Sequence, residues 1–267
     1  MENVIEGSIQ LSLTGRTALV TGGSRGIGAA TVQMFRQAGA RVFFNYRTTK
    51  AQAQKLAASC GGENLCRAAE QDLATPEDGD ALVRSTVEAF GRLDCLVVNH
   101  GVWPPEDVPI GKMSVSQWRS TLGINLDSTF GLVRAAVDQM QRQTPMAGVR
   151  GHIVLVASTA AQRGEAFHAD YAASKGALVS LTKSLSSELA GEGIYCNCVA
   201  PGWVDTEMSA AALKHPETSK RVLATIPLGR PARVEEIAGP ILFLCTPLAG
   251  FVSGEIFNVN GGAVLAG

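Results

Sequence analysis

The fold of this chain is decided by one glycine-rich stretch near its beginning, Thr21-Gly22-Gly23-Ser24-Arg25-Gly26-Ile27-Gly28. It follows an apolar run of strand length, Arg16–Val20, and opens an amphipathic stretch of helix length, Gly26–Gln37. Glycines allow a tight turn there, and the start of the helix offers free N–H groups and the positive end of its dipole to an anion. In this context the stretch predicts a phosphate-binding turn rather than a plain tight turn.

Apolar runs of strand length alternate with amphipathic stretches of helix length along the rest of the chain. The apolar runs are continuous, which is typical of strands buried on both faces of a parallel sheet. We therefore predict an α/β fold: a single doubly wound parallel sheet of about seven strands with helices on both faces, of the Rossmann type. Further strands are expected at Arg41–Tyr46, Leu65–Ala69, Cys95–Asn99, His152–Ala157, Tyr195–Ala200 and Glu255–Val259. Further helices are expected at Thr49–Ser59, Pro76–Phe90, within Val115–Arg142, at Ala169–Ala190 and at Val234–Cys245.

The length of 267 residues fits one domain, covering residues 1–267. Residues 1–12 are expected to form a peripheral N-terminal arm. The stretch from about residue 203 to 225 is irregular, and its part from Ser209 to Thr225 is rich in alanine and polar residues, so we predict a substrate lid there.

Composition excludes several classes of protein. The formal net charge is −1, whereas nucleic acids and anionic membranes favour a basic surface, so neither is expected as a partner. The sequence has no run of 18 apolar residues and starts with an acidic segment that lacks a secretory pattern, which favours a cytoplasmic location. The six cysteines contain no C-x-x-C pair, so no metal site is expected, and free thiols suit a reducing compartment.

Further motifs come at or after the ends of the later strands. They are Asn99-His100-Gly101, Asn125, Ser158, Tyr171-Ala172-Ala173-Ser174-Lys175 and Pro201-Gly202-Trp203-Val204-Asp205-Thr206. With the G-x-x-x-G-x-G spacing of the turn, they resemble the short-chain dehydrogenase/reductase family, and 3-oxoacyl-[acyl-carrier-protein] reductase-like members in particular. The resemblance extends from about Leu13 to Gly262. His100 departs from it, because the family usually has alanine there.

The spacing of Tyr171 and Lys175 places both side chains on one face of a helix. A free tyrosine has a pKa of about 10, and a nearby ammonium favours its ionised form. Tyr171 is then suited to exchange a proton with a carbonyl or alcohol oxygen while a nicotinamide transfers a hydride. The hydroxyl of Ser158 is placed to hold the substrate oxygen. By resemblance, Lys175 binds the nicotinamide ribose and Asn125 holds a water that links Lys175 to solvent.

The end of the second strand, Asn45-Tyr46-Arg47, indicates which nicotinamide is used. A carboxylate there would bind the adenosine ribose and repel a 2′-phosphate, and this chain has none. Arg47 and Arg25 are suited to bind that phosphate. The alternative is that both are ordinary surface arginines exposed to solvent. NADP(H) is therefore preferred, with NAD(H) as an alternative. The cofactor contacts expected, many by resemblance, are Gly22, Ser24, Arg25, Gly26, Ile27, Gly28, Tyr46, Arg47, Asp72, Leu73, Asn99, Gly101, Tyr171, Lys175, Pro201, Gly202, Val204 and Thr206.

The substrate should meet residues that follow the fourth, fifth and sixth strands. Two tryptophans among them favour an apolar or ring-shaped substrate, unless they are packing residues. A histidine near a helix start is either a substrate contact or a structural group. The candidates are Trp103, Thr159, Ala160, Arg163, Glu165, His168, Trp203 and Met208.

These residues predict an NADP(H)-dependent oxidoreductase that interconverts a ketone and a secondary alcohol, acting mainly as a reductase of a 3-oxoacyl or related ketone. An NAD(P)-dependent sugar or polyol dehydrogenase is the alternative. A non-catalytic nucleotide-binding regulatory protein is disfavoured, because all four catalytic positions are intact. The resemblance also implies a homo-oligomer, a dimer or tetramer of twofold symmetry.

Overall fold

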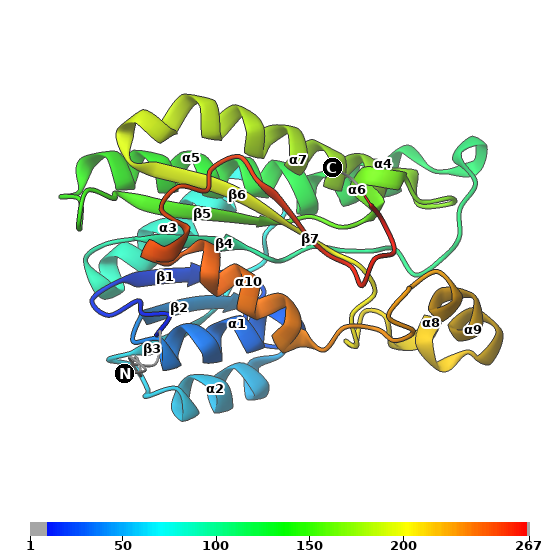
Figure 1. The fold of residues 1–267 in the computed structure, drawn as a ribbon, viewed down its shortest axis with the longest axis horizontal. Helices are drawn as coiled ribbons and strands as arrows, with labels where there is room; N and C mark the ends of the chain where they lie inside the picture. The colour runs from blue at the N-terminus through cyan, green and yellow to red at the C-terminus, as the bar shows by residue number, and fades with distance from the viewer. Residues whose placement is uncertain (1–9, 266–267) are drawn as a thin grey trace, which may run out of the picture.

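The structure is a computed structural model that describes residues 10–265. Its strands form one parallel sheet in the order β3-β2-β1-β4-β5-β6-β7 (Figure 1). The predicted doubly wound sheet is therefore confirmed, and the expected strand ends are displaced by at most one residue. The strands are β1 (Thr17–Val20), β2 (Arg41–Tyr46), β3 (Cys66–Glu70), β4 (Cys95–Val98), β5 (Gly151–Val156), β6 (Ile194–Pro201) and β7 (Ile256–Val259).

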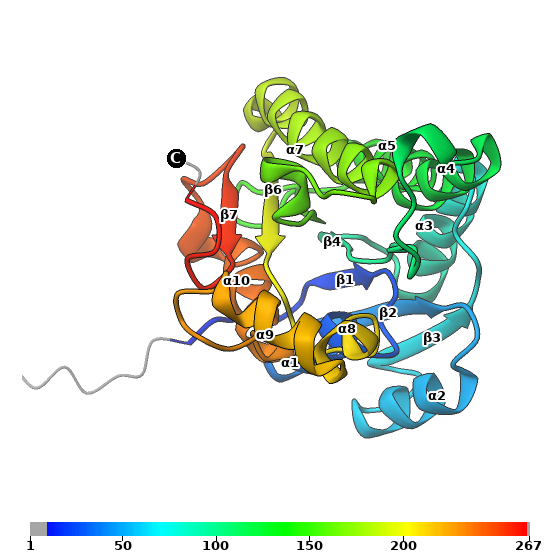
Figure 2. The same cartoon turned by 90° about the vertical axis from the view of Figure 1, so that its right-hand side faces the viewer.

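Helices cover both faces of this sheet. Figures 1 and 2 show α3, α5 and α7 along one face and α1, α2 and α10 along the other. The longer helices are α1 (Gly26–Gln37), α2 (Lys50–Ser59), α3 (Pro76–Phe90), α4 (Val115–Leu122), α5 (Ser128–Arg142), α7 (Ala169–Leu189), α9 (Pro216–Ala224) and α10 (Val234–Leu244). Shorter ones are η1 (Ile110–Lys112), η2 (Gly123–Asp127), α6 (Ala160–Arg163), η3 (Ala190–Glu192), α8 (Ala210–Lys214) and η4 (Pro247–Ala249).

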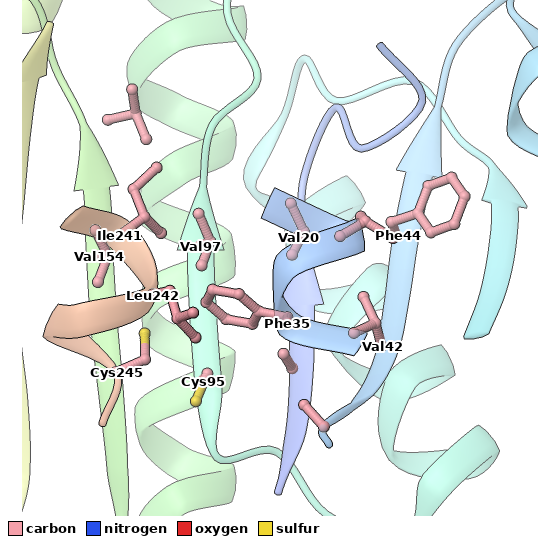
Figure 3. Packing of buried hydrophobic residues seen from close by; sticks show 14 of the residues in the cluster. Val20, Phe35, Val42, Phe44, Cys95, Val97, Val154, Ile241, Leu242 and Cys245 are labelled. Carbon is pink, nitrogen blue, oxygen red and sulfur yellow. The ribbon is translucent and has the colours of Figure 1, made fainter. Parts of the chain in front are cut away.

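The hydrophobic core consists of two clusters, one on each face of the sheet. Phe35 of α1 and Ile241 of α10 pack on Val20 and Val97 on one face (Figure 3). Leu19 of β1 belongs to the other cluster, beneath α3, α5 and α7. Successive strand residues thus point into opposite clusters, which explains why the strand sequences are apolar throughout. All six cysteines are free thiols, and five of them are buried.

The helix expected within Val115–Arg142 is not one continuous α-helix. A π-helical turn, η2, separates α4 from α5. Such a turn has wider hydrogen-bonded rings, and it occurs where a side chain or backbone group is needed for another contact. Asn125 lies in η2, where the helix type changes.

Two further predictions concern the N-terminal arm and the substrate lid. Residues 1–9 of the predicted arm lie outside the described residues, while Leu11 packs against the core and Leu13 is buried. The stretch expected to be a lid contains α8 and α9. In Figures 1 and 2 these helices project beyond the ends of the strands.

The strand order reverses between β1 and β4. From β1 the chain proceeds outward through β2 to β3, and it then returns to β4 on the other side of β1. Val20 of β1 is paired with Phe44 of β2 on one side and with Val97 of β4 on the other. The connections after these two strands diverge, which opens a crevice at their carboxyl ends.

Candidate active site

One pocket of about 330 Å³ runs along the carboxyl ends of the central strands, from the glycine turn to Trp203. Most residues singled out in the sequence line it, although they come from distant segments. Gly28, Asn125, Ala160 and His168 lie behind the wall instead. The expected residues on the wall are Gly22, Ser24, Arg25, Gly26, Ile27, Tyr46, Arg47, Asp72, Leu73, Asn99, Gly101, Trp103, Ser158, Thr159, Arg163, Glu165, Tyr171, Lys175, Pro201, Gly202, Trp203, Val204, Thr206 and Met208.

The glycine turn is shaped by close approaches of its own backbone. Gly22 has a φ of +63°, and its N–H donates to Asn45 Oδ1 at 2.9 Å. A Cβ at Gly28 would lie 2.2 Å from the carbonyl oxygen of Gly22, closer than any side chain tolerates. Only glycine therefore allows helix α1 to start against this turn. The resulting cradle, open to the pocket, fits the pyrophosphate of a dinucleotide.

The end of the pocket beside β2 is polar. Ser24 Oγ lies 2.6 Å from Thr49 Oγ1, and the exposed Arg47 lines the wall beside Thr48. Arg25 forms an ion pair with Glu207, so it already has a carboxylate partner. Neither threonine was predicted as a site residue, although the two follow Arg47 in the sequence. Their position next to a suspected phosphate site was the available signal.

Asn45 and Asp72 complete this end. Asn45 is buried, and its Nδ2 donates to the carbonyl of Gln71 at 2.9 Å, so it joins the glycine turn to the end of β3. Asp72 Oδ1 accepts from the N–H of Leu73 at 3.0 Å. This contact is typical of an aspartate in a turn, and Asp72 also lies on the pocket wall.

Tyr171 and Ser158 meet at the centre of the pocket. Burial raises the pKa of Tyr171 to about 12; its hydrogen bond with Ser158 acts against this, and the charge of Glu165 adds to it. The phenol is therefore protonated at neutral pH in the protein alone. A protonated phenol beside a second hydroxyl can donate a hydrogen bond, and then a proton, to a carbonyl oxygen.

Lys175 lies one helical turn beyond Tyr171, as its spacing predicts. It is buried, and its Nζ donates to the carbonyl of Val156 at 2.8 Å. Nζ lies 5.9 Å from the centroid of the Tyr171 ring. Burial lowers the pKa of Lys175 to about 8, with an opposing effect from Cys198. A water-poor ammonium so close to the phenol favours the ionised form of the tyrosine.

Asn125 lies behind the pocket wall and joins three segments. Its Oδ1 accepts from the N–H of Val102 at 2.8 Å, and its Nδ2 donates to the carbonyl of Val102 and to Ser174 Oγ, both at 3.0 Å. Ser174 Oγ in turn donates to the carbonyl of Tyr171 at 2.7 Å. Asn125 therefore fixes the loop after β4 to helix α7, a connection that the sequence did not reveal.

Asp170 is a further residue that sequence reasoning missed. It is fully buried, accepts hydrogen bonds from Thr121 Oγ1 at 2.7 Å and Gln117 Nε2 at 3.2 Å, and also accepts from the N–H of Tyr171. These contacts hold the start of α7 against α4. Its position immediately before Tyr171, in the first turn of a helix, was the only signal in the sequence.

The substrate side of the pocket has an aromatic corner. Trp103 is stacked on His168, with 4.7 Å between ring centroids, and meets Trp203 edge to face at 6.2 Å. Trp103 Nε1 donates to Glu165 Oε1 at 3.2 Å. His168 is buried, and its Nε2 bonds the carbonyl of Pro104 at 2.9 Å, which favours the structural role over substrate contact. Burial raises the pKa of Glu165.

Comparisons with known proteins agree with this fold and pocket. A family model described as enoyl-(acyl carrier protein) reductase matches residues 22–264. A 3-oxoacyl-[acyl-carrier-protein] reductase from Synechocystis sp. is 34% identical over 258 residues, 95% of this chain and 99% of that protein. An L-rhamnose 1-dehydrogenase (NAD(P)(+)) from Azotobacter vinelandii is 36% identical over 94% of this chain and 97% of that protein. A structure from Agrobacterium tumefaciens with bound NADP, assigned as a 2-deoxy-D-gluconate 3-dehydrogenase, is 32% identical with a TM-score of 0.85 and covers 96% of this chain and 99% of its own.

The chain belongs to the short-chain dehydrogenase/reductase family. It is an oxidoreductase that acts on an alcohol or carbonyl group with a nicotinamide cofactor, so the regulatory alternative is set aside. None of the helices within residues 10–265 is both long and apolar enough to traverse a lipid bilayer. Over the same residues, no three His, Cys, Asp or Glu side chains gather in a way that would hold a metal ion.

Proposed function

We propose that this enzyme is an NADP(H)-dependent oxidoreductase that interconverts a ketone and a secondary alcohol and acts mainly as a reductase. The observation that carries the proposal is the proximity of Tyr171 to Ser158, close enough to affect the pKa of the phenol, next to the buried Lys175 in a pocket continuous with the glycine turn. A proton donor, an oxygen-binding hydroxyl and a cation thus converge where a dinucleotide would end. These are the groups that a carbonyl reduction requires.

In this proposal each side chain has a separate task. Bound NADPH supplies the hydride. The substrate oxygen accepts hydrogen bonds from Ser158 and Tyr171, and Tyr171 releases its proton to that oxygen. Lys175 stabilises the phenolate that remains, because its charge lies within reach of the ring in a water-poor setting. Asn125 is the positioning group that holds α7 against the loop after β4.

The preference for NADP(H) over NAD(H) rests on the polar end of the pocket. Arg47 is exposed there and has no carboxylate at position 45 or 46 to compete with it. Ser24 and Thr49 add hydroxyl donors for a 2′-phosphate. Arg25 would need to exchange its Glu207 partner to contribute. Among the similar proteins, the Agrobacterium tumefaciens structure contains NADP, while the Azotobacter vinelandii relative is named for use of either cofactor.

A sugar or polyol dehydrogenase is the second candidate, and Glu165 favours it. Its carboxylate lies on the pocket wall beside Trp103, close enough to Tyr171 to affect the pKa of the phenol. A carboxylate accepts hydrogen bonds from hydroxyl groups, and tryptophan faces pack on apolar ring faces. An uncharged, hydroxyl-bearing ring would satisfy both. An anionic substrate would be repelled by Glu165.

We further propose that residues 1–267 act as a single domain, that the stretch containing α8 and α9 closes over the substrate, and that the protein works in the cytoplasm as a twofold-symmetric dimer or tetramer. Glu207 and Met208, at the start of that stretch, line the pocket, which supports the closing role. Half-exposed Phe130 on α5 is an apolar group suited to an interface between copies of the chain.

The proposal is tested by an NADPH-oxidation screen of the purified enzyme against β-keto esters, ketoses and other sugars, quinones and cyclic ketones, with each compound repeated using NADH. We expect turnover of at least one ketone with a higher kcat/KM for NADPH. Turnover of sugars or polyols alone, in the oxidative direction, would favour the second candidate. The absence of any turnover across these classes would contradict both.

A further inference from the structure

His100 stands in the turn after β4, at the position where the family usually has alanine. Its ring lies between the end of β1 and the π-helical turn η2. Nδ1 lies 2.8 Å from Thr21 Oγ1, while Nε2 lies 3.0 Å from the carbonyl oxygen of Ile124 and 2.8 Å from Ser128 Oγ. Both ring nitrogens are therefore bonded, Nδ1 to the end of β1 and Nε2 to η2 and the start of α5. An alanine would make none of these contacts.

The hydrogen-bond partners determine the tautomer of His100. The carbonyl of Ile124 can only accept, so Nε2 carries the proton. Nδ1 is then the acceptor, and the Thr21 hydroxyl donates to it at 2.8 Å in preference to the carbonyl of Val97, which lies 3.4 Å away. Burial and the positive charge of Lys175 lower the pKa of His100 to about 4, so the ring is neutral at physiological pH.

The contact with Ile124 explains how η2 keeps its unusual register. The N–H of Ser128 donates to the carbonyl of Gly123, five residues earlier, and not to that of Ile124. The Ile124 carbonyl instead receives two side-chain donors, Ser128 Oγ at 2.8 Å and His100 Nε2 at 3.0 Å. In the π-helical turn the Ile124 carbonyl does not receive the N–H of Ser128, and His100 supplies one of the donors that replace it.

The residue after Ile124 is Asn125, which transmits the effect. Asn125 bonds Val102, two residues after His100, and Ser174, whose hydroxyl bonds the carbonyl of Tyr171. The loop and η2 are therefore fastened twice, by His100 from the loop and by Asn125 from the turn. The second fastening continues into the helix that carries Tyr171 and Lys175.

We propose that His100 is a positioning residue that couples the cofactor-binding end of β1 to Asn125 and, through Ser174, to Tyr171. The inference rests on the proposed function, because it assigns His100 a part in placing the proton donor. In this arrangement a neutral imidazole connects Thr21, behind the glycine turn, to the turn that supports α7. Loss of the ring should displace the catalytic hydroxyl rather than merely loosen the core.

Three variants separate these contacts. His100→Ala removes the contact with Thr21 and also the contacts with Ile124 and Ser128. His100→Gln keeps an N–H donor at about the reach of Nε2, and so retains the bond to Ile124. His100→Asn keeps an acceptor at about the reach of Nδ1, and so retains only the bond to Thr21. The matched control is His152→Ala. The pKa of His152 is likewise lowered to about 4, but this buried histidine lies near the amino end of β5, away from the pocket, against the ring of Tyr195.

The measurements are kcat and KM at saturating NADPH on the ketone found by the screen, the thermal midpoint, and hydrogen exchange of the backbone amides from 122 to 129. For His100→Ala we expect kcat to fall by about tenfold or more, because a small displacement of a proton donor is costly. Exchange in η2 should accelerate. His100→Gln should recover most of kcat, and His100→Asn should not. His152→Ala should lower the thermal midpoint by a similar amount and leave kcat within about twofold.

The inference is overturned if His100→Ala keeps the kcat and the exchange rates of the wild type, or if His152→Ala loses as much activity. If His100→Ala does not fold, the Gln and Asn variants provide the test. The inference is then overturned if His100→Asn is as active as His100→Gln, or more active. Exchange of η2 requires no turnover, so a wild-type enzyme that reduces no ketone would contradict the proposed function while the coupling could still be measured.

Discussion

Glu165 accepts a hydrogen bond of 3.2 Å from the indole N–H of Trp103, and its carboxylate lies close enough to Tyr171 to raise the pKa of the phenol. The residues come from three segments: the loop after β4, the loop before α7, and α7 itself. Burial also raises the pKa of Glu165, so the carboxylate is held in a poorly hydrated setting where its charge acts strongly. The wall of the pocket thus influences the group that we propose moves the proton.

Replacing Glu165 by glutamine should shift the pH dependence of the reaction. Glutamine can still accept from Trp103, but it removes a negative charge that disfavours the phenolate. The pKa of Tyr171 therefore falls. In the proposed mechanism, reduction uses the protonated phenol and alcohol oxidation uses the ionised one. In Glu165→Gln, kcat/KM for oxidation should therefore begin to rise at a lower pH than in the wild type. The kcat/KM for reduction should likewise begin to fall at a lower pH than in the wild type.

The test is a pair of pH profiles of kcat/KM, one in each direction. Glu88→Gln, at an exposed position of α3, is the control and should leave both profiles unchanged. Profiles of Glu165→Gln that coincide with those of the wild type would show that the carboxylate does not act on the proton-transferring group.

Replacing Arg47 by alanine should weaken NADPH binding and spare NADH. A charge-assisted hydrogen bond to phosphate contributes about 1.5–3 kcal/mol, so the Kd of NADPH should rise by roughly tenfold or more. NADH lacks the 2′-phosphate and should bind within about twofold of the wild-type Kd. Fluorescence titration of both cofactors measures this, with the exposed Arg84→Ala on α3 as the control. An equal loss for the two cofactors would argue against the phosphate role.

Replacing Gly28 by alanine should disrupt the glycine turn. The added Cβ would lie 2.2 Å from the Gly22 carbonyl oxygen and 2.7 Å from Asn99 Nδ2, so the turn must shift. We expect a lower thermal midpoint and at least tenfold weaker cofactor binding, since overpacking costs about 1–3 kcal/mol. Gly191→Ala in η3 is the control, because beyond its chain neighbours a Cβ there meets no atom within 4 Å, its φ is not positive and no proline follows it. A Gly28→Ala protein with wild-type cofactor affinity would contradict the role of this turn.

The sequence predicts the sheet and the pocket wall well, for a physical reason. Strand burial on both faces leaves a continuous apolar run, and each strand end carries its functional residues directly after it, as Ser158 follows β5. Local signals suffice for such features. The division of the α4–α5 helix at η2 was not foreseen, because it depends on Asn125 and His100 contacting residues far away in the sequence.

Contacts between residues far apart in the sequence also explain the other features that were not predicted. The pairing of Arg25 with Glu207 joins residues 182 positions apart, and the stacking of His168 on Trp103 joins two loops. Neither leaves a periodicity or spacing that a single sequence displays. Asp170 was missed since an aspartate in the first turn of a helix is ordinary, and only its burial against Thr121 makes it unusual.

The central claim is that Tyr171 transfers the proton, and Tyr171→Phe tests it most directly. Phenylalanine keeps the ring and removes the hydroxyl beside Ser158. Steady-state turnover of the ketone at saturating NADPH should be measured beside the Kd of NADPH. We predict that kcat falls by about 10²–10⁴-fold while the Kd stays within about threefold. A Tyr171→Phe enzyme that binds NADPH and retains near wild-type kcat would contradict it.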